Sequence, residues 1–175
     1  MDLTDINASI QKIADSVKST KPKQNSISVG DAWYLWDILT MKYDSMEVAN
    51  ILSGFINDKD LKIVVASALK VAERTINEME NLILEYAIPL PPRPPKSADS
   101  TINLESITDK YIFNRVLELF KQILTIQVNG FNNSYSPRVV SLFKKFIIEE
   151  MTVIDNLTIY GEAKCYLDPL PMYMP

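Results

Sequence analysis

Carboxylates that lie in phase with apolar helical stripes are the residues of this chain that could do chemistry. Glu150 is spaced from Phe143 and Ile154 so that all three would share one face of a helix, and its carboxylate could point inward. Such a carboxylate could bind a metal ion with oxygen ligands alone. The glutamates that could join it are Glu47, Glu73 and Glu118. The more common arrangement is a glutamate at the edge of the stripe that reaches solvent or pairs with a lysine or arginine.

The chain contains no histidine, and this removes most other chemistry. A di-iron centre in a helical bundle uses Glu-x-x-His on two helices. The nearest matches, residues 73–76 (Glu-Arg-Thr-Ile) and 150–153 (Glu-Met-Thr-Val), lack the histidine. Ser-His-Asp and Cys-His catalysis and most zinc sites are excluded for the same reason. We therefore expect no catalytic, cofactor-binding or metal-binding residues, and we expect that the protein is not an enzyme.

Trp33 and Trp36 lie one helical turn apart with Tyr34 between them. Aromatic side chains in this arrangement could line a ligand pocket or bind a partner. More often such a pair belongs to the core and to a contact between helices. The single cysteine, Cys165, lies near the end of an apolar helical stripe and is expected to be a small core residue.

The first residues of the chain carry a second candidate interface. Apolar residues recur there at intervals of three and four, the narrow stripe of a helix that docks on another helix: Leu3, Ile6, Ile10, Ile13 and Val17. The stripe must be buried against this domain or against another subunit. Residues 18–27 are polar, include Pro22 and are typical of a linker. The predicted organisation is thus an N-terminal amphipathic helix and linker over 1–27, followed by a helical bundle domain over 28–175.

Proline placement divides the rest of the chain into windows that can hold long helices, because proline breaks helix interiors. The first helix is expected from Ser28 to about Gly54 with an apolar face at Ala32, Trp36, Leu39, Tyr43 and Met46. The second begins at 57–60 and ends after Ile88, with the most regular stripe of the chain: Leu61, Val65, Ala68, Ala72, Ile76, Met79, Ile83 and Tyr86.

Two further helices are predicted in the second half of the chain. One spans about 108–128, is closed by Gly130 and packs through Phe113, Leu117, Phe120 and Leu124. The other begins at Ser136-Pro137, an N-cap followed by proline at the first helical position, and runs to about Tyr166. Its stripe is Val140, Phe143, Ile147, Ile154 and Leu157. No segment alternates with period two, so the fold class is all-α.

The lengths of the connections predict how the helices are arranged. Short turns make the first two helices antiparallel neighbours, and the last two likewise. About 20 residues, 89–107, separate the pairs, and an extended segment of that length reaches about 60 Å, more than the roughly 42 Å of one long helix. One long crossover between two antiparallel hairpins is the ferritin-like arrangement. The crossover begins with the proline-rich run 89–95, which is a stiff spacer or, alternatively, a PxxP ligand for a partner.

Composition gives further expectations about partners and location. The net charge is -4, which argues against nucleic-acid binding. The N-terminal residues lack the apolar region of a signal peptide, and no apolar run is long enough to cross a bilayer. We expect a soluble, cytoplasmic protein.

Three stretches of the sequence together resemble a known family: residues 28–36 (SVGDAWYLW), 55–62 (FINDKDLK) and 86–91 (YAIPLP). They are similar to the spore-coat-like, ferritin-like bundle proteins of Bacillus-type bacteria, a family with a domain of unknown function. The matching motifs mark helix starts, a turn and a helix stop. The resemblance therefore implies a fold, a link to sporulation and a place in the spore coat, but no catalytic residues.

Two function classes follow. The first is a non-catalytic structural or interaction protein that associates with itself or with other spore-coat proteins. The alternative is a helical bundle that binds a small molecule, or a metal through carboxylates alone. The residues proposed for a pocket or interface are Trp33, Trp36, Glu150, Leu3, Ile6, Ile10 and Ile13.

Overall fold

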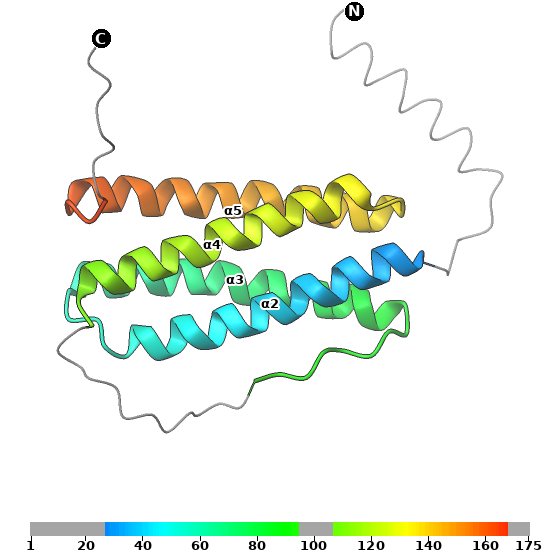
Figure 1. The fold of residues 1–175 in the computed structure, drawn as a ribbon, viewed down its shortest axis with the longest axis horizontal. Coiled ribbons are helices and arrows are strands. Elements are labelled where there is room, and N and C mark those ends of the chain that lie inside the picture. The colour runs from blue at the N-terminus through cyan, green and yellow to red at the C-terminus, as the bar shows by residue number, and fades with distance from the viewer. Residues whose placement is uncertain (1–26, 95–106, 168–175) are drawn as a thin grey trace, which may run out of the picture.

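The computed structural model describes residues 27–94 and 107–167, which form a bundle of four long α-helices (Figure 1). The helices are α2 (Val29–Ser53), α3 (Lys59–Glu85), α4 (Asp109–Asn133) and α5 (Pro137–Ala163). The helix predicted within residues 1–27 and the second half of the crossover lie outside the described residues. None of the four helices is long and apolar enough to span a membrane.

The arrangement of the helices confirms the predicted topology. Helices α2 and α3 form one antiparallel hairpin, and α4 and α5 form the other (Figure 1). Helix α3 ends at the opposite end of the bundle from the start of α4, so these two helices run parallel. This is the ferritin-like, two-hairpin bundle with one long connection.

Side-chain caps define where three of the helices begin. The Ser28 hydroxyl accepts a hydrogen bond from the Asp31 amide at 3.0 Å, and Thr108 accepts from the Tyr111 amide at 3.2 Å. The Asp58 carboxylate accepts from the amides of the two residues that follow Lys59. Helix α5 begins with Pro137 at its first position, as predicted, although the Ser136 side chain makes no capping hydrogen bond. These contacts satisfy amide groups that a helix start leaves without an intrahelical partner.

The predicted ends of the last two helices were wrong by several residues. Helix α4 continues through Gly130 to Asn133, and α5 ends at Ala163 rather than near Tyr166. Gly130 is buried inside the helix, where a Cβ atom would come within 3.0 Å of Phe143 and 3.1 Å of Ile38. The glycine is therefore required for close packing of helices and does not terminate α4.

One aspartate of each hairpin forms hydrogen bonds with the turn of the other hairpin. Asp31 at the start of α2 accepts hydrogen bonds from the amides of Tyr135 and Ser136, in the turn between α4 and α5, at 3.0 and 3.2 Å. Asp109 at the start of α4 does the same for the turn between α2 and α3, through the amides of residues 57 and 58 at 2.8 and 3.0 Å. The two reciprocal contacts fix both ends of the bundle.

The two hairpins also end in the same backbone motif. After α3, Ala87 has φ 55°, and the amide of Ile88 bonds the carbonyl of Ile83 at 3.2 Å. After α5, Cys165 has φ 54°, and the amide of Tyr166 bonds the carbonyl of Gly161 at 2.9 Å. Both are Schellman caps with a non-glycine residue in the left-handed position. Cys165 is exposed there, so its predicted place in the core was wrong.

Substituting either left-handed residue by glycine is expected to stabilise the protein. Ala87→Gly and Cys165→Gly should each raise the free energy of unfolding by about 0.5–1 kcal/mol, because glycine adopts positive φ without a Cβ clash. Urea unfolding followed by circular dichroism measures the change. The control is Ala66→Gly, at an exposed position inside α3. This variant should lower the free energy of unfolding by about 1 kcal/mol. A loss at Ala87 or Cys165 of the same size as at Ala66 would contradict the assignment.

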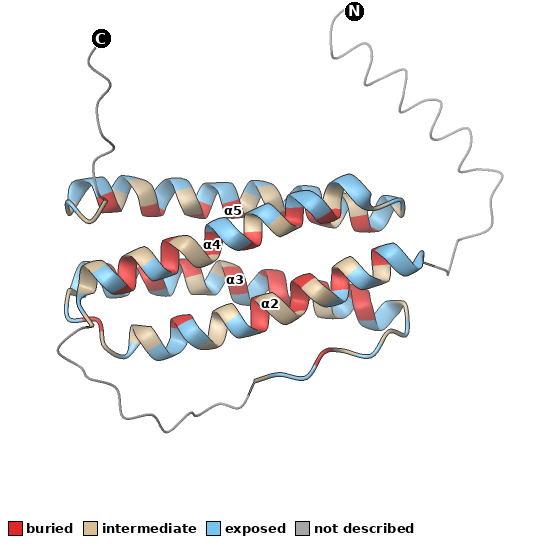
Figure 2. Ribbon diagram, viewed as in Figure 1, coloured by how far each residue is buried: buried red, intermediate tan, exposed pale blue. Residues whose placement is uncertain are grey.

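The core consists of two apolar clusters, one in each half of the bundle (Figure 2). The stripe predicted for α3 is confirmed from Leu61 to Ile83, and Tyr86 lies at its edge. On α2 the predicted face was rotated from the true one: the buried residues are Asp31, Leu35, Ile38, Leu39, Lys42, Tyr43 and Ala49. On α5 the true core face is Val139, Phe143, Phe146, Glu150, Val153, Leu157 and Gly161.

The first part of the crossover packs on the bundle. Pro91 is buried, and Leu90 contacts the cluster formed by α2, α3 and α5. The Arg93 guanidinium lies 4.8 Å from the centre of the Tyr43 ring and pairs with Glu80, whose carboxylate also accepts the Tyr43 hydroxyl. One side of the proline-rich run is thus used within this molecule, as a spacer on the bundle surface would be.

Candidate functional site

Apart from Asp31 at the start of α2, each of the four helices buries one polar side chain in the bundle. Lys42 of α2 and Thr75 of α3 are 1% and 0% exposed, and Gln127 of α4 and Glu150 of α5 are both 0% exposed. Side chains on facing helices are the positions from which bundles build cofactor and metal sites. This group of four residues, called here the central polar layer, is therefore the first candidate site.

A lysine and a glutamate form an ion pair in the central polar layer. The Lys42 ammonium lies 3.3 Å from Oε1 of Glu150 and donates a second hydrogen bond to the Thr75 hydroxyl at 3.1 Å. The Thr75 hydroxyl donates its own proton to the Ala72 carbonyl at 2.9 Å, so it is free to accept from the lysine. The Phe146 ring lies 5.8 Å from the ammonium. The lysine is therefore held from three sides.

Burial shifts the pKa of both members of the ion pair toward the neutral forms. It lowers the pKa of the Lys42 ammonium, and the attraction of Glu150 offsets this only in part. Burial likewise raises the pKa of the Glu150 carboxyl, against the opposite effect of Lys42. Each charge is thus tolerated in the interior because the other is present, and loss of one partner would leave an uncompensated buried charge.

Little space remains around the central polar layer. A cavity of about 20 Å³ beside Lys42 is lined by Ser45, Ala72 and Phe120 among others, which is enough for one water molecule. The Gln127 amide and Oε2 of Glu150 have no hydrogen-bond partner among the described residues. The central polar layer thus has polar atoms without hydrogen-bond partners, but it has no space for a small-molecule ligand.

The glutamates considered as partners of Glu150 in a metal site lie elsewhere. Glu73 is exposed on α3, Glu47 is half-buried on α2, and Glu118 pairs with Lys121 at 3.4 Å on α4. Within residues 27–94 and 107–167, no three acidic, cysteine or histidine side chains are grouped as a metal ion would need. Glu150 does point inward, but the residue that meets it is a lysine.

The two tryptophans lie on the surface, so the expectation that they belong to the core was wrong. Trp33 is 56% exposed and Trp36 is 37% exposed. Trp33 contacts only its neighbour Tyr34 among aromatic rings of the described part, edge to face at 5.0 Å. They are therefore separated from Glu150 and available for contacts outside the bundle. Leu3, Ile6, Ile10 and Ile13 lie outside the described residues.

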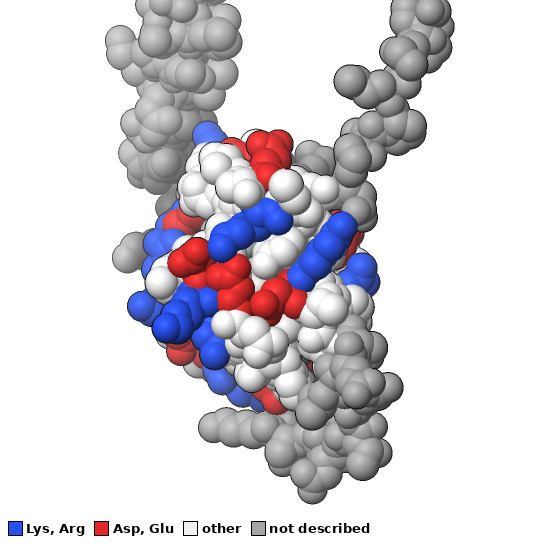
Figure 3. Space-filling view, turned by 90° about the vertical axis from the view of Figure 1, so that its left-hand side faces the viewer, with Lys and Arg blue, Asp and Glu red and all other residues white. Residues whose placement is uncertain are grey.

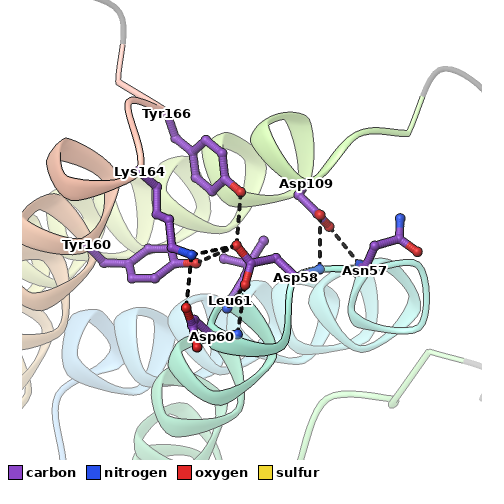
Figure 4. A network of polar contacts seen from close by, with 8 residues as sticks. All are labelled: Asn57, Asp58, Asp60, Leu61, Asp109, Tyr160, Lys164 and Tyr166. Atoms are coloured by element: carbon purple, nitrogen blue, oxygen red, sulfur yellow. Dashed lines mark hydrogen bonds and ion pairs between the residues drawn. The ribbon is translucent and has the colours of Figure 1, made fainter.

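A second polar network joins three segments at one end of the bundle (Figures 3 and 4). Its centre is Asp58, whose Oδ2 accepts from Lys164 at 2.9 Å and from the hydroxyls of Tyr160 and Tyr166 at 3.5 and 3.4 Å. Lys164 also bonds Asp60 at 2.9 Å. Figure 3 shows acidic and basic side chains side by side on this end. The network links the start of α3 to the end of α5 and is fully explained by that structural role.

Asp58 gives the protein a predicted acid sensitivity. The hydrogen bond from Lys164, with help from the amides of Asp60 and Leu61, lowers the pKa of Asp58 from 3.8 to about 2. Because the folded-state pKa is the lower one, ionised Asp58 stabilises the fold above about pH 4, and this contribution is lost as the pH falls toward 2.

The change Asp58→Asn should remove that acid-dependent part of the stability. Asparagine still caps α3 but cannot ionise, so the urea midpoint should fall less between pH 4 and pH 2 than it does in the unmodified protein. Asp44→Asn, at an exposed position of α2, is the matched control and should keep the original profile. Equal acid sensitivity of Asp58→Asn and the unmodified protein would contradict the assignment.

An open groove lies between α3 and α5. It has a volume of about 610 Å³ and includes Leu82 and Leu142. Ion pairs join the two helices along it, Glu78 with Lys145 at 2.5 Å and Glu85 with Arg138. Its charged side chains thus satisfy one another, and it contains none of the residues predicted as a site.

Sequence reasoning missed Lys42, Thr75 and Gln127. Lys42 continues the spacing of Leu35 and Ile38 along α2, and that phase could have placed it in the core. The positive charge made a surface position the natural expectation. Gln127 likewise follows Phe120 and Ile123 on the buried face of α4.

Solved structures share this fold at low sequence identity. A protein of Bacillus halodurans C-125 that has been proposed to be a spore coat protein superposes with a TM-score of 0.79 and 18% identity, over 89% of this chain and 100% of its own. A conserved hypothetical protein of Mycobacterium tuberculosis gives a TM-score of 0.65 at 11% identity, over 77% and 99%.

A third similar structure supplies the name of the fold. A two-domain protein of Anabaena variabilis contains a DJ-1/ThiJ/PfpI-like domain and a ferritin-like domain; it gives a TM-score of 0.64 at 15% identity, over 86% of this chain and 42% of its own. No protein-family model and no curated protein sequence matches this chain. At these identities the similarities establish the fold alone.

Proposed function

We propose that this chain is a non-catalytic structural protein that acts by binding other protein surfaces. The observation that carries the proposal is the ion pair of Lys42 and Glu150 at 3.3 Å. Bundles of this fold hold a cofactor or metal between facing helices in the core. In this chain the Lys42 ammonium is the cation at that place. The interior thus stabilises the fold, and the surface is the part of the molecule that can bind other proteins.

We further propose that the protein associates with the spore coat. The support is the fold shared with the Bacillus halodurans protein, itself proposed to be a spore coat protein, over 100% of that protein's length. The motifs at 28–36, 55–62 and 86–91 that resemble spore-coat-like proteins coincide with the start of α2, the turn between α2 and α3, and the end of α3. The shared elements are those that build the bundle.

A small-molecule or carboxylate-only metal bundle is the alternative function. It would need space or a second carboxylate next to Glu150. The cavity beside Lys42 has a volume of about 20 Å³, and the nearest charge to Glu150 is the Lys42 ammonium. Neither observation favours a ligand, so the structural function is the better supported of the two.

The location of a fluorescent fusion in the native host tests the spore-coat proposal. The protein should concentrate at the surface of the forespore during sporulation. A variant with Lys164→Ala, which loses the contacts to Asp58 and Asp60, controls for the loss of a surface ion pair and should still concentrate there. Signal spread evenly through growing and sporulating cells would contradict a place in the coat.

A further inference from the structure

Helix α2 carries apolar residues on its outer side as well as in the core. On α2 the usual segregation of apolar from polar residues is weak, because Asp31 and Lys42 are buried while Trp33 and Trp36 are exposed. Within the described residues α2 packs mainly on α3 and α4, and it meets α5 through the ion pair of Lys42 with Glu150. Large apolar side chains on its outer side are left exposed by these contacts.

Five large apolar side chains of α2 are exposed: Val48 and Ile51 lie in its C-terminal half, and the other three lie in its N-terminal half. Val29 is 88% exposed, Trp33 is 56% exposed and Trp36 is 37% exposed. Their spacing of four and three places them on one face, here called the outer stripe. The stripe lies at the N-terminal half of α2, directly after the residues that lead into the helix.

We infer that residues 3–17 of the same chain cover the outer stripe as a helix. Leu3, Ile6, Ile10, Ile13 and Val17 give this segment a narrow apolar seam suited to one facing helix. As a helix the segment is about 22 Å long, longer than the roughly 10 Å from Val29 to Trp36 along α2. The seam and the stripe are thus two apolar faces that lie near each other in the sequence.

The connection between the two faces favours this occupant over a second copy of the chain. Residues 18–27 form a linker of ten residues that can span up to about 33 Å, enough for the segment to fold back along α2. A short linker also gives the segment an effective concentration in the millimolar range at the stripe. A separate molecule at micromolar concentration competes poorly with such a segment. The inference does not depend on a role in the spore coat.

Intrinsic fluorescence reports on this contact directly, because Trp33 and Trp36 are the only tryptophans of the protein. The test compares the full chain with a double variant, Ile6→Glu and Ile10→Glu, that places two charges in the seam. The matched control, Asn7→Glu and Gln11→Glu, adds the same charges at the same spacing off the seam. Circular dichroism verifies that all three proteins retain the bundle.

The expected result is a change in the seam variant alone. Its emission should shift to longer wavelength and its quenching by acrylamide should increase, while the control matches the unmodified chain. The spectra should not depend on protein concentration. Equal spectra for all three proteins would overturn the inference. A blue shift that disappears on dilution, together with a dimer mass in light scattering, would also overturn it and would assign the stripe to a second copy.

Discussion

Replacing Lys42 by methionine is expected to lower the free energy of unfolding by about 3–5 kcal/mol, because Glu150 would then be a buried charge without a partner. The two side chains are 1% and 0% exposed and lie 3.3 Å apart. Methionine has a volume close to that of the aliphatic part of lysine, so the loss reports on charge and not on packing. Urea unfolding at neutral pH, followed by circular dichroism, measures the change.

The double variant Lys42→Met, Glu150→Leu is the control for this prediction. Replacing both members of a buried ion pair by apolar side chains is often neutral or stabilising, by about 1–4 kcal/mol. The double variant should therefore recover most of the stability that the single variant loses. If the two substitutions destabilise additively, Lys42 and Glu150 do not act as a pair, and the central polar layer has been misinterpreted.

Gly161→Ala is expected to lower the free energy of unfolding by about 1–3 kcal/mol through overpacking. A Cβ atom at this position would lie 2.7 Å from Cε1 of Phe113, closer still to its Cζ, and 3.1 Å from Leu167. The Phe113 ring is fully buried and is flanked by Tyr160 at 6.0 Å and Tyr166 at 5.5 Å between ring centres. These neighbours restrict how far the Phe113 ring can move away from an added Cβ atom.

The sign of the effect makes this prediction specific. Helix propensity alone favours alanine over glycine by up to about 1 kcal/mol, so without the clash Gly161→Ala would stabilise α5. Gly30→Ala is the control, because a Cβ there meets nothing nearer than the Ser28 hydroxyl at 3.8 Å. It should be neutral or stabilising. Urea midpoints that rise for both variants would refute the close packing at Gly161.

Periodicity in the sequence predicts the face of a helix only where one side of the helix is apolar. Helix α3 meets this condition, and its predicted stripe from Leu61 to Ile83 is the buried one. Helix α2 does not, because Trp33 and Trp36 face outward while Lys42 faces inward. The prediction assigned the large apolar side chain of Trp36 to the buried face. It also assigned the charged Lys42 to the surface, so the predicted face was rotated from the true one.

The candidate site was foreseen in one residue out of its four. The position of Glu150 between Phe143 and Ile154 indicated an inward carboxylate. Its partner lies 108 positions away in the sequence, on a helix of the other hairpin. Such pairing depends on the register of α2 against α5, which no local pattern records. The same is true of Asp31 and Asp109. The sequence indicates that each lies at the start of a helix, but the hydrogen bonds from each to the opposite turn form only in the folded bundle.

The mass of the intact protein, purified from its native host and measured by native mass spectrometry, tests most directly whether the centre of the bundle holds only the chain's own groups. The result we predict is the mass of the polypeptide, 19.9 kDa or a multiple of it, with no stoichiometric metal or small molecule. An adduct of one metal or ligand per chain that disappears in folded Glu150→Gln would contradict the account. The bundle would then be a binding protein whose site is the central polar layer.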